Sequence, residues 1–212
     1  MAIRNIVFDL GNVLVDFDPP AYLLKCGFNA ETAAHLLADV FSGAWQKGDA
    51  GDYLTVRALR DDLCKSHPDR KKAIRRALRP DCVRMHVLRP AVADWLCDLK
   101  KSGCRVYLLS NLAKYSHDYV RGYPFFRVLD GAVFSYRERV CKPDERIYRI
   151  LLERYALVPE ETVFLDDSAE NVAAAERCGM QAIVFTDLAA AKAQLEALLQ
   201  RESSFDGKGN DA

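Results

Sequence analysis

Six side chains suited to chemistry stand at or shortly after the ends of apolar stretches of the sequence. They are Asp9, Ser110, Asn111, Lys142, Asp166 and Asp167. Short continuous apolar stretches are typical of strands in a parallel sheet that is covered on both faces. Because ligands bind beyond the carboxyl ends of such strands, we expect the six side chains to meet at one edge of a sheet.

The acidic members of this set predict a divalent cation. Asp9, Asp166 and Asp167 would repel one another, and at least one of their pKa values would rise unless a cation lay between them. Mg²⁺ prefers oxygen ligands and typically binds one or two carboxylates together with water and phosphate. We therefore expect Mg²⁺ as the cofactor.

The other members of the set suit a phosphoryl group. Ser110 and Asn111 supply a hydroxyl and an amide, and Lys142 supplies a positive charge, so that together they match a tetrahedral dianion. Phosphoryl transfer depends mainly on positioning and on neutralisation of charge. An aspartate can be the nucleophile by forming an acyl phosphate that water then cleaves. The expected partner is a small-molecule phosphate ester.

The apolar stretches alternate with helical patterns along most of the chain. Strands are expected at 5–9, 105–111, 132–135, 162–166 and 181–185. Pro90 begins one helical pattern, Asp144 and Ser168 are expected N-caps of two others, and Gly179 ends the last. This alternation predicts an α/β fold, a Rossmann-like doubly wound parallel sheet with helices on both faces.

The alternation stops between residues 18 and 86, where helical patterns follow one another without a convincing strand. This segment is too long for an ordinary crossover connection. It predicts an inserted all-helical cap domain at 18–86, a core made of 1–17 and 87–200, and a hinge near 15–20 and 84–90. The segment 201–212 contains turn formers and little to bury, so we expect a mobile tail.

Composition limits the class of protein and its partners. Thirty basic residues balance thirty acidic ones, so no global field attracts nucleic acid or an anionic membrane, and neither is an expected partner. The seven cysteines contain no Cys-x-x-Cys pair, which favours a reducing compartment. The sequence shows no signal-peptide core and no membrane-spanning run, so the expected location is cytoplasmic. The oligomeric state stays open.

Four segments in order resemble the motifs of the haloacid dehalogenase (HAD) superfamily. They are Phe8-Asp-Leu-Gly-Asn-Val-Leu14, Leu109-Ser-Asn111, Lys142-Pro143 and Phe164-Leu-Asp-Asp-Ser-Ala-Glu-Asn171. The resemblance runs from residue 5 to about 187 and includes a helical insertion where the family carries its cap. Within the superfamily the sequence is most similar to bacterial phosphatases that act on α-D-glucose 1-phosphate.

The resemblance implies a Mg²⁺-dependent phosphatase and a role for each residue of the set. Asp9 would be the nucleophile. The metal would be held by Asp9, the backbone carbonyl of Gly11, Asp167 and, directly or through a water, Asp166. The phosphoryl group would be bound by Ser110, Asn111 and Lys142. Lys142 would also neutralise charge on the nucleophile. Apart from the resemblance, the position of Asn171 one turn after the acidic pair makes it a candidate to orient the pair, and a solvated helix residue is the other interpretation.

One position departs from the resemblance. Many phosphatases of the superfamily carry a second Asp two residues after the nucleophile, as general acid and base, whereas this sequence has Gly11. Loss of a general acid typically costs ~10²–10⁴-fold in rate. A good leaving group, a water, or a side chain such as Asn12 or Asp16 would compensate, or the activity would be weak.

The glycines of the cap segment Gly43–Gly51 predict a turn between helices. The segment also resembles the substrate-specificity loop of helical caps. Within it Trp45 is a candidate to stack on a sugar, and Lys47 is a candidate to reach phosphate. A place for Trp45 in the core of the cap is an equally good interpretation.

These observations lead to one function and two alternatives. The leading hypothesis is a Mg²⁺-dependent phosphomonoesterase that hydrolyses a small phosphorylated metabolite, such as a sugar 1-phosphate, through an aspartyl-phosphate. The first alternative is a metal-independent 2-haloacid dehalogenase, against which the Asp166-Asp167 pair argues. The second is a weakly active or inactive binding protein of the same fold.

Overall fold

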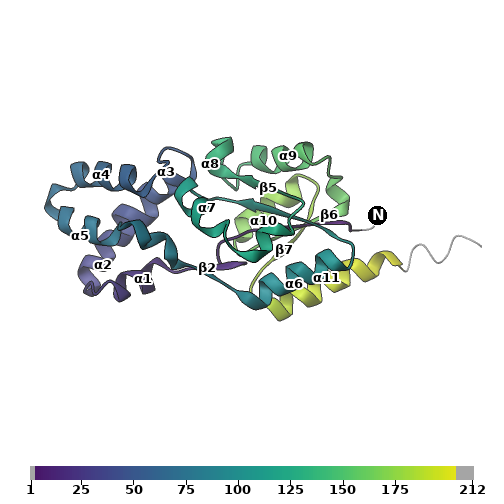
Figure 1. The fold of residues 1–212 in the computed structure, drawn as a ribbon. Coiled ribbons are helices and arrows are strands. Elements are labelled where there is room, and N and C mark those ends of the chain that lie inside the picture. The colour runs from purple at the N-terminus through teal and green to yellow at the C-terminus, as the bar shows by residue number, and fades with distance from the viewer. Residues whose placement is uncertain (1–2, 204–212) are drawn as a thin grey trace, which may run out of the picture.

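A five-stranded parallel sheet with the order β5-β4-β1-β6-β7 forms the centre of the larger part of the molecule (Figure 1). The computed structural model describes residues 3–203, of which 201–203 by backbone only. The strands are β1 (Asn5–Phe8), β4 (Arg105–Ser110), β5 (Gly131–Phe134), β6 (Thr162–Asp166) and β7 (Gln181–Val184). Each lies within a residue of the stretch expected from the sequence, so the predicted parallel sheet is confirmed.

The central strands are apolar throughout because both faces of the sheet are covered. Alternate side chains of β1 enter different clusters, Ile6 and Phe8 on one face and Val7 on the other. The first face packs against α6 (Pro90–Lys101) and α11 (Leu188–Ser203), and the second against α9 (Glu145–Arg154) and α10 (Ala169–Arg177). This is the doubly wound arrangement predicted from the alternation of elements.

The helices begin where local chemistry predicts. Asp144 accepts a hydrogen bond from a backbone N–H at the start of α9, and Ser168 does so at the start of α10. Pro90 is the first residue of α6. Two short helices follow β4 and β5 at the same edge of the sheet, α7 (Lys114–Val120) and α8 (Ser135–Glu138).

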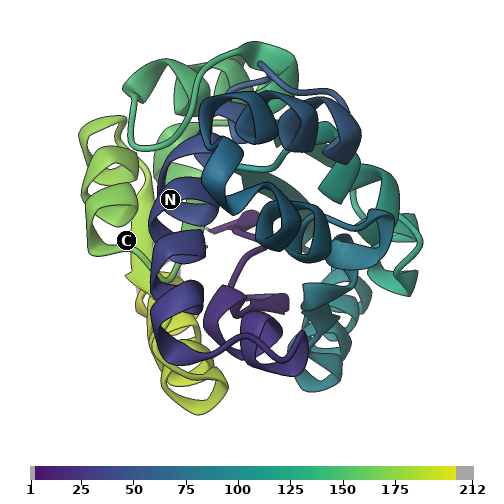
Figure 2. The same ribbon diagram turned by 90° about the vertical axis from the view of Figure 1, so that its left-hand side faces the viewer.

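A helical body lies between the first and second core strands in sequence and beside the carboxyl edge of the sheet in space (Figures 1 and 2). Its helices are α1 (Pro19–Lys25), α2 (Ala30–Leu36), the π-helix η1 (Leu37–Ala44), α3 (Trp45–Asp49), α4 (Val56–Ser66) and α5 (Lys71–Ala77). These helices enclose a hydrophobic cluster of their own, to which Tyr115 of the core also belongs. We call this body the cap.

Two features of the cap differ from the sequence interpretation. The chain enters and leaves it through a two-stranded antiparallel sheet of β2 (Val15–Phe17) and β3 (His86–Leu88), strands too short to give a pattern. The turn expected at Gly43–Gly51 is wrong for most of its length, since η1 and α3 run through it to Asp49. Close packing explains one of its glycines: a Cβ on Gly48 would lie 2.6 Å from the hydroxyl of Tyr115.

The C-terminal helix α11 continues to Ser203, and residues 204–212, the rest of the expected tail, lie outside the described residues. Within the described chain, no helix combines the length and the apolar character that crossing a membrane would need.

Candidate active site

The strand register brings the predicted nucleophile beside the first residue of the acidic pair. Strands β1 and β6 are parallel neighbours with Phe8 opposite Leu165, so Asp9 and Asp166 leave the sheet side by side. The Asp9 backbone N–H donates to the Leu165 carbonyl at 2.8 Å. On the other side of β1, β4 ends at the buried Ser110. The sheet edge therefore gathers residues from three separate parts of the sequence.

Lys142 bridges the two buried carboxylates. Its Nζ lies 2.7 Å from Oδ1 of Asp9 and 2.6 Å from Oδ2 of Asp166, and it also donates to the Leu109 carbonyl at 3.0 Å. The Asn111 amide fixes the backbone of Lys142 by accepting from its N–H at 2.8 Å and donating to its carbonyl at 2.9 Å. The Lys142 ammonium is thus held at the strand ends both by its own hydrogen bonds and by the hydrogen bonds of Asn111 to the Lys142 backbone.

Burial sets the ionisation of this cluster. It raises the pKa of Asp9 to about 6; the charge of Lys142 lowers that pKa, and the charge of Asp166 raises it. Burial also lowers the pKa of Lys142, but the two carboxylates outweigh it and the net direction is upward. Asp9 is therefore ionised near neutral pH and paired with a cation that keeps its proton.

The acidic set fits a divalent cation. One carboxylate oxygen from each of Asp9, Asp166 and Asp167 lies within 4.8 Å of the others. Lys142 bridges Asp9 and Asp166, so that in the described chain three carboxyl groups share one bridging ammonium. Asp167 is exposed, so this side of the cluster faces solvent. Carboxylate oxygens with this charge are the donor set that Mg²⁺ prefers.

Neighbouring amides orient the acidic pair. Oδ1 of Asp166 accepts from the Asn171 amide at 2.9 Å and from the Ser168 backbone N–H at 2.8 Å, as the position of Asn171 one turn into α10 suggested. Oδ2 of Asp167 accepts from the Asn12 amide at 3.1 Å. Asn12 has a φ of 54°, a backbone region that Asn tolerates better than most residues. Both carboxylates are thus held before any ligand binds.

A small cavity of about 120 Å³ lies between this cluster and the cap. Its lining residues are Leu10, Gly11, Phe17, Trp45, Asp49, His86, Ser110, Asn111 and Leu112. A Cβ on Gly11 would meet only Oδ2 of Asp9, at 4.0 Å, so the space beside Asp9 is open. The wall formed by the cap carries one carboxyl group, that of the partly buried Asp49.

The two cap residues expected to meet substrate differ in position. Trp45 is 4% exposed, and its ring packs against Phe17, Phe41 and Tyr115, as expected for a residue in the core of the cap. It also lines the cavity. Lys47 is exposed and is not part of the cavity lining. The structure thus brings Trp45 to the site and leaves Lys47 outside it.

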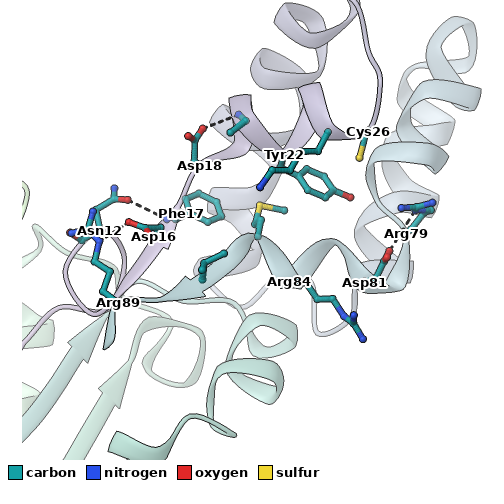
Figure 3. A pocket seen from close by; sticks show the side chains of 14 residues that line it. Asn12, Asp16, Phe17, Asp18, Tyr22, Cys26, Arg79, Asp81, Arg84 and Arg89 are labelled. Atoms are coloured by element: carbon teal, nitrogen blue, oxygen red, sulfur yellow. Dashed lines mark hydrogen bonds and ion pairs between the residues drawn. The ribbon is translucent and has the colours of Figure 1, made fainter. Parts of the chain in front are cut away.

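A second, larger cavity of about 710 Å³ lies behind the two-stranded connection (Figure 3). Its labelled side chains run from Asn12 and Arg89 near the core to Arg79 and Asp81 on the cap. Asp16 lines this cavity and pairs with Arg89 at 2.5 Å. Asp16 therefore does not compensate for the missing acid at Gly11.

Sequence reasoning did not single out Asp49 or the contact of Asn12 with Asp167. Asn12 belongs to the first motif and Asp49 to the Gly43–Gly51 segment, but the sequence does not show these contacts, because they depend on the tertiary structure. The pKa of Asp49 is raised to about 7, chiefly by burial and also by the charge of Asp9, while the backbone N–H of Ala113 lowers it. A carboxyl group with such a pKa beside a nucleophile is a typical feature of active sites.

Comparisons with known proteins give relatives among hydrolases. Residues 3–179 match the family of haloacid dehalogenase-like hydrolases. The D-ribitol-5-phosphate phosphatase of Bacteroides thetaiotaomicron is 26% identical over 84% of this chain and 90% of its own length. The sesquiterpene phosphatase astK of Aspergillus oryzae is 32% identical over 58% of this chain, and the match spans only 59% of that relative. A match to the drimenol cyclase drtB of Aspergillus calidoustus spans 34% of that protein at 25% identity.

Solved structures support the same fold. One solved structure is that of a HAD family enzyme from Bacteroides thetaiotaomicron in complex with magnesium and inorganic phosphate. Its TM-score is 0.67, the match covers 86% of this chain and 93% of that enzyme, and the sequence identity is 23%. At this identity the likeness shows the fold alone. Dehalogenases are among the other solved proteins with this fold.

Proposed function

Since the chain belongs to the haloacid dehalogenase-like hydrolases, we propose that it is a Mg²⁺-dependent phosphomonoesterase that acts on a small phosphorylated metabolite. The observation that carries this proposal is the buried contact of Lys142 with Asp9 and Asp166 beneath a cavity lined by Ser110 and Asn111. The proposal is supported by the position of Ser110 and Asn111 in the lining of this cavity, next to the strand ends where Lys142 holds Asp9.

Asp9 is the proposed nucleophile. Its Oδ2 lies on the side of the open space at Gly11, while Oδ1 is held by Lys142. Attack on the phosphorus forms an aspartyl-phosphate and releases the alcohol, and water then cleaves the acyl phosphate. Ser110 and Asn111 hold the transferring group, and the charge of Lys142 stabilises the negative charge on it.

Mg²⁺ would be held by Asp9, Asp167 and the backbone carbonyl of Gly11, with Asp166 directly or through a water. When bound, it neutralises negative charge on the phosphoryl oxygens. The carboxylate cluster and the magnesium complex of the related fold support this choice of cofactor.

The proposed substrate is a sugar or polyol phosphate. A relative that matches most of this chain is a D-ribitol-5-phosphate phosphatase, and a further one, 25% identical over 91% of this chain, is a phosphorylated carbohydrates phosphatase of Thermotoga maritima. The sequence motifs resemble those of glucose 1-phosphate phosphatases, and the anomeric oxygen of such a substrate leaves more readily than an ordinary alcohol. A cytoplasmic location is part of the proposal, supported by seven free cysteines.

The test is phosphate release from a panel of sugar and polyol phosphates, with Mg²⁺ and with EDTA. We expect release with Mg²⁺ only, and a loss of at least ~10³-fold in Asp9→Asn because the nucleophile is gone. Asp98→Asn, the same change in an exposed side chain on α6, is the control. Turnover that survives in Asp9→Asn, or chloride release from 2-haloacids without metal, would overturn the proposal.

A further inference from the structure

In the described part of the chain, the core side of the cavity offers the leaving oxygen no acid beyond the groups that the proposal already assigns to the nucleophile, the metal and the phosphoryl group. An alcohol leaves poorly as an alkoxide, so its oxygen needs a proton as the P–O bond breaks. Gly11 has no side chain, Asp16 is paired with Arg89, and the amide of Asn12 is engaged with Asp167 and with the backbone N–H of Phe17. The donor has to come from elsewhere in the cavity wall.

The cap places a carboxyl group on the opposite wall. Asp49 is the last residue of α3, and it lines the same cavity as Gly11, Ser110 and Asn111. The end of α3 is fixed to the core, because the Asp49 carbonyl accepts from the Ser135 hydroxyl at 2.6 Å. The contact of Gly48 with Tyr115 holds the same turn of helix. The backbone at the end of α3 is therefore held by two core elements, α8 and α7.

The surroundings of Asp49 favour its protonated form. Burial and the negative charge of Asp9 raise its pKa to about 7, and no basic side chain of the described chain is among the groups that shift it. The other titratable groups around it are Tyr115 on α7, Cys141 beside Lys142, and His86 on β3. Burial keeps the first two protonated and lowers the pKa of His86 to about 4, so that His86 is neutral.

We propose that Asp49 is the general acid of this enzyme, supplied by the cap in place of the side chain that Gly11 lacks. This inference rests on the proposed phosphatase function. As the Asp9 oxygen bonds to phosphorus, the bond from phosphorus to the leaving oxygen breaks and that oxygen takes the proton of Asp49. The Asp49 carboxylate then takes a proton from the water that attacks the aspartyl-phosphate, which releases phosphate and restores both side chains.

This role explains why a fixed cap position matters to the chemistry. The donor is in place only when α3 lies against the segment that follows β4, so cap closure completes the catalytic set as it excludes water. An open cap leaves the nucleophile without its acid.

The test compares first-turnover rates of Asp49→Asn on two esters. One is an alkyl phosphate, whose leaving oxygen needs a proton, and the other is p-nitrophenyl phosphate, which leaves as a stable anion. We expect the first turnover to slow by ~10²–10³-fold on the alkyl ester and by no more than about threefold on the aryl ester. Steady-state turnover should slow on both, since the base for the second step is lost. Asp52→Asn, in an exposed residue of the following turn, is the matched control.

Two further readouts separate catalysis from positioning. In the parent enzyme the alkyl-ester rate should fall as pH rises through about 7, and this fall should disappear in Asp49→Asn. Adding Gly11→Asp to the Asp49→Asn variant should raise its alkyl-ester rate at least tenfold. A Cβ at position 11 meets only Oδ2 of Asp9, at 4.0 Å. Binding of inorganic phosphate, measured by calorimetry, should be unchanged in Asp49→Asn.

Equal slowing of the first turnover on both esters, or weaker phosphate binding, would overturn the assignment and make Asp49 a structural contact. A parent enzyme that releases phosphate from neither ester would instead refute the phosphatase function itself, so the two failures are distinguishable.

Discussion

At the scale of single residues, the site depends on one ammonium between two buried carboxylates. The Lys142 side chain is 2% exposed, and that of Asp166 is fully buried. Removal of one member of such a group leaves a charge without a partner, which costs more than the intact group contributes. Lys142 is therefore required for the stability of the sheet edge, apart from the role in binding a phosphoryl group that we propose for it.

We expect Lys142→Met to lower the free energy of unfolding by about 3–5 kcal/mol at pH 8. The pKa of Asp9, already about 6, would rise further, so the folded state would hold a proton that the unfolded state releases. The deficit should therefore shrink as pH falls from 8 to 5. Urea denaturation at both pH values measures it, with Lys114→Met, at a partly exposed lysine on α7, as control. A deficit that is the same at both pH values would contradict this account.

At the scale of elements, the close contact between α3 of the cap and α7 of the core positions the cap on the core. Gly48 faces the hydroxyl of Tyr115, a buried group with no hydrogen-bond partner in the described structure. Gly43, five residues earlier, would place a Cβ 3.8 Å from the Ala38 carbonyl, an ordinary contact. Two glycines of one helical segment thus have different physical reasons to be there.

We expect Gly48→Ala to destabilise the protein by about 1–3 kcal/mol because the new methyl group collides with the tyrosine hydroxyl. Tyr115→Phe in the same chain should recover most of this loss by removing the colliding atom. Gly43→Ala should be neutral or stabilising by up to about 1 kcal/mol, since alanine favours helix. Thermal unfolding of the four proteins measures the pattern. If Gly48→Ala melted at or above the parent temperature, the assigned close approach would be wrong.

At the scale of the whole molecule, core and cap meet around the two-stranded connection. His86 begins β3 and is 3% exposed. Its ring lies against Phe17 of the connection and Trp45 of the cap, with centroids 5.0 Å and 6.3 Å away. A charged imidazole does not suit this apolar junction, so its protonation opposes the folded arrangement of the two bodies.

We expect acid to weaken the protein through this histidine. Burial lowers the folded-state pKa of His86 to about 4, against about 6.5 when unfolded, so the unfolded chain binds the extra proton between these values. Above pH 6.5 the titration of His86 costs the folded protein nothing. The free energy of unfolding then falls by about 3 kcal/mol as pH drops to 4. The free energy of unfolding of His86→Phe should therefore fall by about 3 kcal/mol less than that of the parent between pH 6.5 and pH 4. The exposed His35→Asn should track the parent, and parallel curves for His86→Phe would refute the account.

Much of the fold was predictable because its signals are local. The strand positions, the N-caps Asp144 and Ser168 and the helical insertion follow from apolar runs and cap chemistry of neighbouring residues. The short strands β2 and β3 were not predictable, since three residues give no period and their pairing joins positions about seventy residues apart. The helical segment through Gly43 and Gly48 was misread as a turn because packing against Tyr115, which the sequence does not show, requires glycine at position 48.

The sequence by itself determined which residue types end each core strand, and hence that Asp9, Ser110 and Asp166 share one edge of a parallel sheet. Only the tertiary structure decided that Lys142 bridges the buried carboxylates, that Lys47 is not part of the cavity lining, and that Asp49 of the cap lines the same cavity as Gly11. The reason is physical: strand ends are fixed by local patterns, whereas the meeting of cap and core depends on the docking of two hydrophobic surfaces that are distant in the chain.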